Sequence, residues 1–286
     1  MTASVAHRES GKAADVYDLR AEYLTSLRTK VTQADGKVVT EFTLSKHLAH
    51  AFNVCLNTGC LPPELSWGKG CPLHKAGTPS VHDNRVITIE PVLAKVFSAI
   101  MQQRASQYLE SHQLRVPEQC GFRRQRSCAD QLFVLDHIIR KYQAQGIKVT
   151  ALFVDFRKAF DSVPRDMLFT RLKQLGFSSK YLQLLKSMYD TARVSFGVHG
   201  LLTEPVPTHA GVLQGDPLSP TLFGIYIDCV IAYMQRMCRQ AVVPEVGGQS
   251  VHGLLYADDL VLLSLDSSSA QQQLNALASF CKHYGL

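Results

Sequence analysis

Two apolar runs that carry acidic residues set the tightest limits on this fold. The run HGLLYADDLVLLS at residues 252–264 places Asp258 and Asp259 between apolar segments, and VTALFVDF at 149–156 places Asp155 in a similar setting. Because an ionised carboxylate that is buried alone costs several kcal/mol, each acid must reach solvent, a turn or a cation. We therefore expect 252–264 to form a hairpin with its acids at the turn, and 149–156 to form a strand that ends at its acid.

Two such strands, about a hundred residues apart in the chain, can lie side by side in one sheet and bring their acids to one point. Converging carboxylates are the donors of a two-metal site, in which Mg²⁺ ions about 3.5–4 Å apart activate an attacking oxygen and stabilise a leaving one. The alternative for Asp258 and Asp259 is simple turn chemistry, because a hairpin needs a solvated turn and Ala-Asp-Asp supplies one.

Length and composition indicate an ordinary globular chain. It has 286 residues, of which 46% are hydrophobic and 19% charged, which is sufficient for a normal core. No apolar run is long enough to span a membrane and the N-terminus lacks the apolar centre of a signal peptide, so we expect an intracellular protein, nuclear or cytoplasmic. The formal net charge of +6 suits a polyanionic partner. Eight irregularly spaced cysteines indicate reduced thiols.

Apolar periodicity predicts one continuous fold behind a loose front end. Residues 1–15 are small and polar and are expected to be disordered, and a helix is expected over 16–31. A strand is expected at 192–200. Further helices are expected at 43–57, 89–112, 131–146, 162–176, 178–190, 219–237 and 268–286. The expected helix N-caps include Ser162, Ser178 and Ser219.

Five motifs in order resemble those of a known family. FVDFRKAFDSV at 153–163, GVLQGDPLSP at 211–220 and YADD at 256–259 resemble the central palm motifs of reverse transcriptases. Their particular forms are similar to those of non-LTR (LINE-type) retrotransposons. Upstream, residues 52–96 follow that family's lead-in and fingers pattern, and CGFRRQRSCADQL at 120–132 matches its G-F-R-x-x-R-S motif. Their joint order is specific, although no single motif is.

The resemblance implies an α+β right-hand polymerase fold, with fingers and palm subdomains and an antiparallel palm sheet packed on helices. It covers 44–286 as a reverse transcriptase domain, and leaves 1–43 as an N-terminal extension that is partly disordered and then helical. The chain departs from the family at DNRVITI (83–89), where a tyrosine and a proline are usual. The family also continues beyond Leu286 through an Asn-x-x-Lys segment into a helical thumb, so the resemblance predicts a truncated domain with the thumb missing.

The implied activity is that of an RNA-directed DNA polymerase, a nucleotidyltransferase that adds deoxynucleotides to a primer 3′-hydroxyl by two-metal phosphoryl transfer. The implied partners are an RNA template, a DNA primer and deoxynucleoside triphosphates, with no membrane and no obligate protein partner evident. The implied cofactor is a pair of Mg²⁺ ions, for which Mn²⁺ is a substitute. The alternative is a truncated, catalytically inactive retrotransposon remnant that only binds nucleic acid. A palm-fold nucleotidyl cyclase is excluded, because it requires a G-G-[DE]-[DE]-F hairpin.

The resemblance also assigns the acids. Asp155 and Asp258 correspond to the principal metal ligands, and Asp259 completes the carboxylate group in a more peripheral place. The backbone carbonyl of Phe156 lies where the family uses a further metal ligand. These assignments are what the resemblance implies for the converging strands.

Nucleotide and template contacts follow in the same way. The residues expected to hold the incoming nucleotide are Lys75, Arg85, Phe160, Gln214 and Gly215, with Phe160 excluding a ribose 2′-hydroxyl. The residues expected to contact template phosphates are Arg123, Arg124 and Arg126. For the cations the alternative is a solvated surface, and for Phe160 it is core packing.

Overall fold

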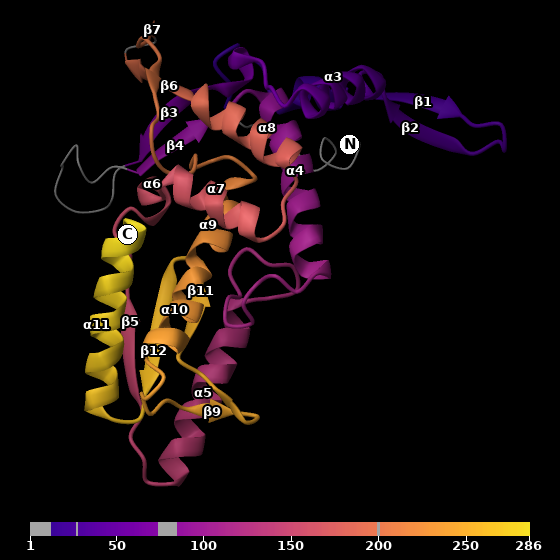
Figure 1. Ribbon diagram of the computed structural model, residues 1–286. Coiled ribbons are helices and arrows are strands. Elements are labelled where there is room, and N and C mark those ends of the chain that lie inside the picture. The colour runs from indigo at the N-terminus through magenta and orange to yellow at the C-terminus, as the bar shows by residue number, and fades with distance from the viewer. Residues whose placement is uncertain (1–12, 27, 74–84, 199–200) are drawn as a thin grey trace. The chain divides into compact units, whose positions relative to one another are not determined.

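The computed structural model describes residues 13–26, 28–73, 85–198 and 201–286 (Figure 1). Residues 1–12, which make up most of the segment expected to be disordered, lie outside these described residues. Lys75 also lies outside them. The chain forms two compact units: the first comprises Met1–Arg104, Leu172–His209 and Leu213–Ser219, and the second comprises Ala105–Arg171, Ala210–Val212 and Pro220–Leu286. The predicted boundary between residues 43 and 44 stays a prediction.

The first unit begins with a short helix and a β-hairpin, where a single helix over 16–31 was expected. That expectation is wrong beyond α2 (Ala21–Ser26), because β1 (Arg28–Thr32) pairs in antiparallel register with β2 (Val38–Phe42). The sequence reason is the cluster of β-branched residues in both strands, which favours extended backbone. The turn is closed by Gly36, which has a positive φ of 80°.

Asp15 corrects the expectation that the front end is disordered throughout. Its side chain is only 5% exposed. One carboxylate oxygen accepts hydrogen bonds from the N–H groups of Tyr17 and Leu19, and the other accepts from the N–H of Val92 at the start of a helix. Asp15 thus anchors the start of the described chain and supplies an acceptor at that helix N-terminus.

The first unit also contains a helical layer and a five-stranded sheet. The helices are α3 (Ser45–Thr58), most of α4 (Val92–Ser111) and α8 (Ser179–Asp190), close to their predicted bounds. The Ser178 hydroxyl accepts from the N–H of Tyr181, so its predicted role as a cap is confirmed. The sheet has the order β4-β3-β6-β7, with β8 also paired to β6. Its strands are β3 (Trp67–Leu73), β4 (Arg85–Ile89), β6 (Arg193–Val198), β7 (Leu201–Leu202) and β8 (Val206–Pro207).

The second unit is built on a three-stranded antiparallel sheet of order β11-β12-β5. Its strands are β11 (Gly253–Tyr256), β12 (Asp259–Ser264) and β5 (Thr150–Val154). The hairpin and the side-by-side pairing of the two acid-bearing segments are therefore confirmed. Helices α5 (Cys128–Ala144) and α11 (Ser267–Tyr284) pack on the sheet, and a buried cluster joins Ile138, Tyr142, Leu254 and Leu263.

Two predicted helices differ from the observed elements. Residues 162–176 were expected to form one helix capped by Ser162, but Ser162 ends α6 (Ala159–Ser162), and α7 (Arg165–Gln174) follows Pro164. The Ser162 hydroxyl donates to the carbonyls of Arg157 and Lys158, so it lies at the C-terminal end of α6 and not at the N-terminus of the predicted helix. Residues 219–237 were expected to form one helix and instead form two, α9 (Ser219–Ile227) and α10 (Cys229–Met237).

Ser219 was expected to cap the helix at 219–237, and this expectation is also wrong. Its hydroxyl has no hydrogen-bond partner within the described residues. Asp216 acts instead, because its carboxylate accepts from the N–H of Leu218 and its carbonyl accepts from the N–H of Ser219.

The remaining strands, β9 (Glu245–Val246) and β10 (Gln249–Ser250), form a separate small hairpin.

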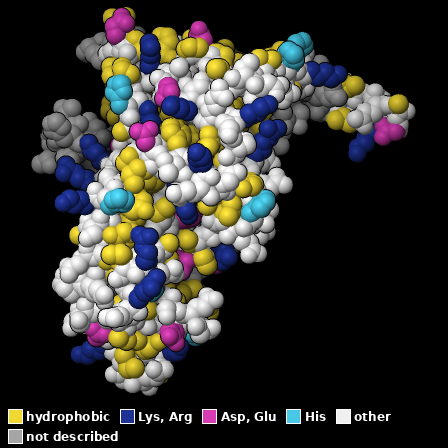
Figure 2. All heavy atoms as spheres, in the orientation of Figure 1, with side chains coloured by type: hydrophobic (Ala, Val, Ile, Leu, Met, Phe, Trp, Pro, Cys, Tyr) yellow, Lys and Arg dark blue, Asp and Glu magenta, His cyan; other side chains and the backbone are white. Residues whose placement is uncertain are grey.

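The surface carries many cations. Lys and Arg side chains are scattered over the face seen in Figure 2, with few acidic side chains between them, as the net charge of +6 leads one to expect. All eight cysteines are free, as predicted. None of the helices in the described part of the chain is both long and apolar enough to cross a membrane.

Candidate active site

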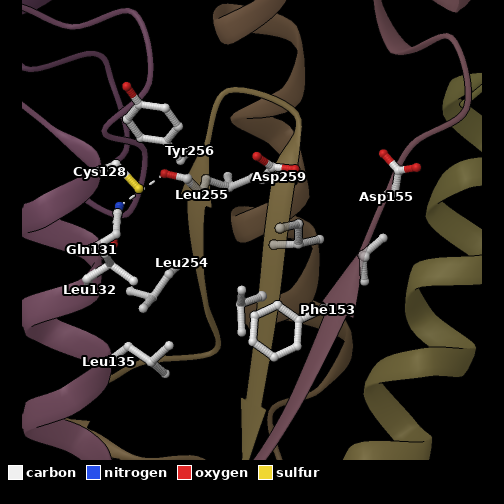
Figure 3. Close-up of a pocket in the computed structure, with 13 residues that line it drawn as sticks. Cys128, Gln131, Leu132, Leu135, Phe153, Asp155, Leu254, Leu255, Tyr256 and Asp259 are labelled. Atoms are coloured by element: carbon white, nitrogen blue, oxygen red, sulfur yellow. Dashed lines mark hydrogen bonds between the residues drawn. The ribbon is translucent and has the colours of Figure 1, made fainter. Parts of the chain in front are cut away.

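Asp155 directly follows β5 and Asp259 begins the neighbouring strand β12, at the same end of the three-stranded sheet (Figure 3). The register pairs Val154 with Leu260, so the next position along each strand sets Asp155 against Asp259. On the other side Asp259 is paired with Tyr256. Both acids are exposed. The structure thus brings together two acids from segments that are distant in the sequence.

The two acids share one face of the sheet with apolar side chains. Side chains alternate between the two faces of a strand, which places Phe153 beside Asp155 on the same face. This face borders a pocket of about 350 Å³. The side chain of Phe153 is 76% exposed there, and that of Leu132 on α5 is 60% exposed. The pocket is lined by Cys128, Gln131, Leu132, Leu135, Phe153, Val154, Asp155, Leu254, Leu255, Tyr256, Asp259, Leu260 and Val261.

Asp258 occupies the turn between β11 and β12 and is half-buried. It follows Ala257, whose φ of 60° is in the left-handed region that residues other than glycine rarely adopt. Within the described residues no group of three or more His, Cys, Asp or Glu side chains is gathered closely enough to hold a metal ion. The metal group of Asp155, Asp258 and Asp259 therefore stays a prediction, as does the Phe156 carbonyl.

The chemistry of the paired acids nevertheless fits a divalent cation. Like charges directly opposite one another on neighbouring strands are destabilising. Neither Asp155 nor Asp259 has an ion-pair partner among the residues that the structure describes. Carboxylate oxygens are the ligands that Mg²⁺ prefers. A divalent cation near this end of the sheet would therefore find carboxylate donors from both strands.

Phe160 is partly a packing residue. Its ring stacks on that of Phe223 with centroids 4.5 Å apart and planes 15° from parallel, and Phe122 meets it edge-on at 6.1 Å. Phe223 is fully buried, whereas Phe160 is only half-buried. Core packing, the alternative stated for this residue, is therefore real, and it holds the ring in place. The role of Phe160 in choosing the sugar stays a prediction.

Of the described residues expected to hold the nucleotide, Arg85, Gln214 and Gly215 belong to the first unit. Gln214 and Gly215 lie against β4, the strand that begins with Arg85. The carbonyl of Gln214 accepts a 2.6 Å hydrogen bond from the N–H of Thr88 on β4. Gly215 has a φ of 113°, and a Cβ there would stand 2.3 Å from the Thr88 carbonyl oxygen, so only glycine fits. Arg85, at the start of β4, is exposed.

The three arginines expected to contact template differ in their surroundings. Arg123 forms an ion pair with Glu110 through two nitrogens and donates to the carbonyls of Val116 and Gln119. The hydrogen bond to Glu110 is the main cause that raises the pKa of Arg123. Arg124 and Arg126 are exposed. Arg123 thus has a structural role that the sequence did not indicate, and template contact by all three stays a prediction.

Asp216 is a buried acid that the sequence analysis did not single out, although it lies inside the LQGDPLSP motif. It is 4% exposed. Burial raises the pKa of its carboxyl to about 6, against a smaller lowering by the hydrogen bond from the N–H of Leu218. An Asp three residues before a predicted helix start was the available signal, because Asp is a favoured residue just before helices.

Comparison with known proteins identifies relatives of this chain. A family model described as reverse transcriptase (RNA-dependent DNA polymerase) matches residues 73–286. A probable RNA-directed DNA polymerase from transposon BS of Drosophila melanogaster is 27% identical over 250 residues, which cover 83% of this chain and 26% of that protein. A Pol polyprotein from the type-1 retrotransposable element R2 of Popillia japonica is 30% identical over 210 residues, which cover 71% of this chain and 28% of that protein. The chain thus spans about a quarter of the length of these relatives.

Solved structures share the fold. An apo telomerase from Candida tropicalis superposes with a TM-score of 0.59 at 11% identity, covering 94% of this chain and 52% of that one. A telomerase from Candida albicans in complex with a telomeric RNA fragment gives a TM-score of 0.57 at 14% identity, covering 93% and 48%. At these identities the likeness concerns the fold alone, and it confirms the predicted α+β right-hand polymerase fold.

Proposed function

Because the chain belongs to the reverse transcriptase (RNA-dependent DNA polymerase) family, we propose that it adds deoxynucleotides to a primer 3′-hydroxyl under the direction of an RNA template. The predicted resemblance to the reverse transcriptase domain of non-LTR retrotransposons is confirmed by its relatives. The observation that carries the proposed activity is that Asp155, just after β5, and Asp259, at the start of the neighbouring β12, line the same pocket. In this proposal the second unit contains the palm and the first unit contributes fingers.

The acids supply the donors for the metal ions that this chemistry uses. Asp155 and Asp258, with Asp259 and the carbonyl of Phe156, would hold two Mg²⁺ ions, and Mn²⁺ would substitute. Such ions, when bound, neutralise the charge that develops as the primer oxygen attacks the α-phosphate and pyrophosphate leaves. The contribution of the chain itself is positioning, because the sheet register sets the spacing of the carboxylates before any ligand arrives.

The remaining candidates bind and select the nucleotide. The guanidinium of Arg85 suits a phosphate group, for which its planar fork gives paired hydrogen bonds, and Lys75 would add a point charge. The Gln214–Gly215 backbone would border the base. Phe160, whose ring is held by Phe223, would lie beside the sugar and exclude a 2′-hydroxyl.

Primer extension on an RNA template tests the proposed activity. Deoxynucleotide incorporation should require Mg²⁺ or Mn²⁺ and should fall at least about a hundredfold in Asp155→Asn and in Asp259→Asn, because each removes charge stabilisation of the transition state. Asp136→Asn is the matched control, since Asp136 is a 58% exposed side chain on the surface of α5. It should retain full incorporation.

Binding of the same primer–template duplex separates the proposed activity from its alternative. All three variants should bind it as tightly as the unmodified chain, within about threefold. A chain that binds the duplex but incorporates nothing with either metal would contradict the proposed activity and favour the inactive, nucleic-acid-binding remnant. An equal loss in Asp136→Asn would show that the effect is not specific to the paired acids.

A further inference from the structure

We propose that Gln119 is a positioning residue that fixes the turn carrying Asp258 and Asp259, and this inference rests on the proposed function. Gln119 lies outside the reverse transcriptase residues that the sequence analysis assigned to metal, nucleotide or template. Its side chain is fully buried. Both polar atoms of its side-chain amide form hydrogen bonds with backbone groups, those of Ala257 in the turn and the N–H of Gly121.

The side-chain amide of Gln119 forms hydrogen bonds with both backbone polar groups of Ala257. Its Nε2 donates to the carbonyl of Ala257 at 3.1 Å, and its Oε1 accepts from the N–H of Ala257 at 2.9 Å. The same Oε1 accepts from the N–H of Gly121 at 2.8 Å. This set of partners admits only one orientation of the amide, because both N–H groups need an acceptor and the carbonyl needs a donor.

Ala257 is a residue whose backbone needs such support. Its φ of 60° is unfavourable for a residue with a side chain, and strained backbone persists only when its surroundings hold it. The next residue is Asp258, and the one after it is Asp259, which begins β12. The backbone conformation of Ala257 therefore sets the positions of the next two residues, which carry both carboxylates. A small rotation there would displace Asp258 and move Asp259 relative to Asp155.

The segment around Gln119 is itself joined to the hairpin. The N–H of Cys120 donates to the carbonyl of Leu255, and the N–H of Leu255 donates to the carbonyl of Glu118. Gln131 of α5 closes the arrangement, because its Nε2 donates to the carbonyls of both Leu255 and Glu118. Gln119 thus acts from a fixed support, which is what a positioning residue requires.

Gln119→Met tests this role, because methionine is unbranched and apolar, fills similar space and removes all three hydrogen bonds. Gln273→Met is the matched control. Gln273 is also fully buried, and its Nε2 donates to the carbonyls of His252 and Leu263 in the same sheet, away from the turn. Both variants lose buried hydrogen bonds, so both should lower the melting temperature. Only Gln119→Met should change the turn and its acids.

Hydrogen exchange of the Ala257 amide, followed by NMR in protein labelled with ¹⁵N-alanine, directly measures how firmly Gln119 holds the turn. We expect exchange to be at least tenfold faster in Gln119→Met and unchanged within threefold in Gln273→Met. Gln119→Glu adds a rescue test. Its ionised carboxylate would face the Ala257 carbonyl, whereas the protonated form donates to that carbonyl and still accepts from the N–H groups. The excess exchange over the unmodified chain should therefore fall as the pH is lowered.

Mn²⁺ binding, measured by electron paramagnetic resonance, tests whether the hydrogen bonds of Gln119 affect the acids of the proposed metal site. The Kd for Mn²⁺ should rise at least tenfold in Gln119→Met and stay within threefold in Gln273→Met, with duplex binding unchanged in both. Equal exchange of Ala257 in the two variants, or equal Mn²⁺ affinity, would overturn the role of Gln119. If the unmodified chain binds no Mn²⁺, the proposed function fails, and the exchange measurement still decides whether Gln119 holds the turn.

Discussion

At the scale of single residues, the environment of a side chain decides its chemistry more than its type does. Asp155 and Asp216 are both acids within the motifs, yet Asp155 is exposed at the end of a strand and Asp216 is buried before a helix. The exposed acid is available to a cation. The buried acid accepts a hydrogen bond from the N–H of Leu218 and helps to start α9. One therefore belongs to the proposed site, and the other stabilises the loop that carries Gln214.

Asp216 gives the stability of the chain a predictable pH dependence. Burial raises the pKa of its carboxyl to about 6 in the folded state, and the value in the unfolded chain is about 3.9. The folded state therefore holds a proton that the unfolded state releases. The contribution of this group to stability is complete below about pH 4 and is lost as the pH rises to about 6, at about 1.4 kcal/mol for each pKa unit.

Asp216→Asn should therefore stabilise the chain more at pH 7.5 than at pH 4.5, because asparagine cannot ionise and its side-chain oxygen still accepts from the N–H of Leu218. Urea unfolding at the two pH values measures this difference in the free energy of unfolding. Asp190→Asn, at an exposed position at the end of α8, should change that free energy about equally at both. A gain in Asp216→Asn that is the same at both pH values would contradict the prediction.

At the scale of elements, the hairpin depends on a segment that is neither helix nor strand. Residues 118–121 lie against β11, and Gln119 forms an isolated parallel bridge with Leu255. Gly121 allows this close approach. A Cβ at Gly121 would stand 2.1 Å from the nitrogen of Ala257 and 2.7 Å from its Cα, so it would collide with backbone that cannot move aside.

Gly121→Ala should therefore push the segment away from the turn. We expect it to lower the free energy of unfolding by about 1–3 kcal/mol, the usual cost of overpacking. Gly197→Ala on β6 is the control, because a Cβ there meets only the flexible end of Lys69, at 3.5 Å. It should change stability by less than about 1 kcal/mol. Equal effects in the two variants, measured by urea unfolding, would show that the close approach to Ala257 is not limiting.

At the scale of the whole molecule, the excess of positive charge predicts how the chain binds nucleic acid. The net charge is +6, and Arg124 and Arg126 are exposed beside the segment that supports the hairpin. Each arginine that neutralises a phosphate releases condensed counterions, so the logarithm of affinity falls linearly with the logarithm of salt concentration. The number of phosphates that these residues neutralise can therefore be obtained from a slope.

The double variant Arg124→Gln with Arg126→Gln should weaken binding of an RNA·DNA duplex and reduce the magnitude of that slope by about 0.7–0.9 for each phosphate that is no longer neutralised. Fluorescence anisotropy over a range of salt concentrations measures both quantities. Arg140→Gln is the control, because Arg140 is 77% exposed and pairs with Asp136 on the same helix. An unchanged slope in the double variant would assign both arginines to a solvated loop.

Elements whose signals are local could be predicted from the amino-acid sequence alone. Apolar periodicity and capping residues predicted α3, α4, α8 and α11 close to their observed bounds, because these signals act between residues a few positions apart. The acids inside apolar runs predicted the hairpin and its partner strand for the same reason. Local signals misled where they competed, as in 16–31, where helical spacing coincided with β-branched residues.

Features that depend on register and on distant contacts required the folded structure. Which acid faces Asp155 follows from the pairing of β5 with β12, and a shift of one residue would have turned the opposite face outward. The stacking of Phe160 on Phe223 and the hydrogen bonds of Gln119 with Ala257 join residues that are far apart in the chain. The burial of Asp216 likewise depends on the folded chain around it. A linear pattern contains the types of these residues but not their distances, and hydrogen bonding, packing and pKa all depend on distance.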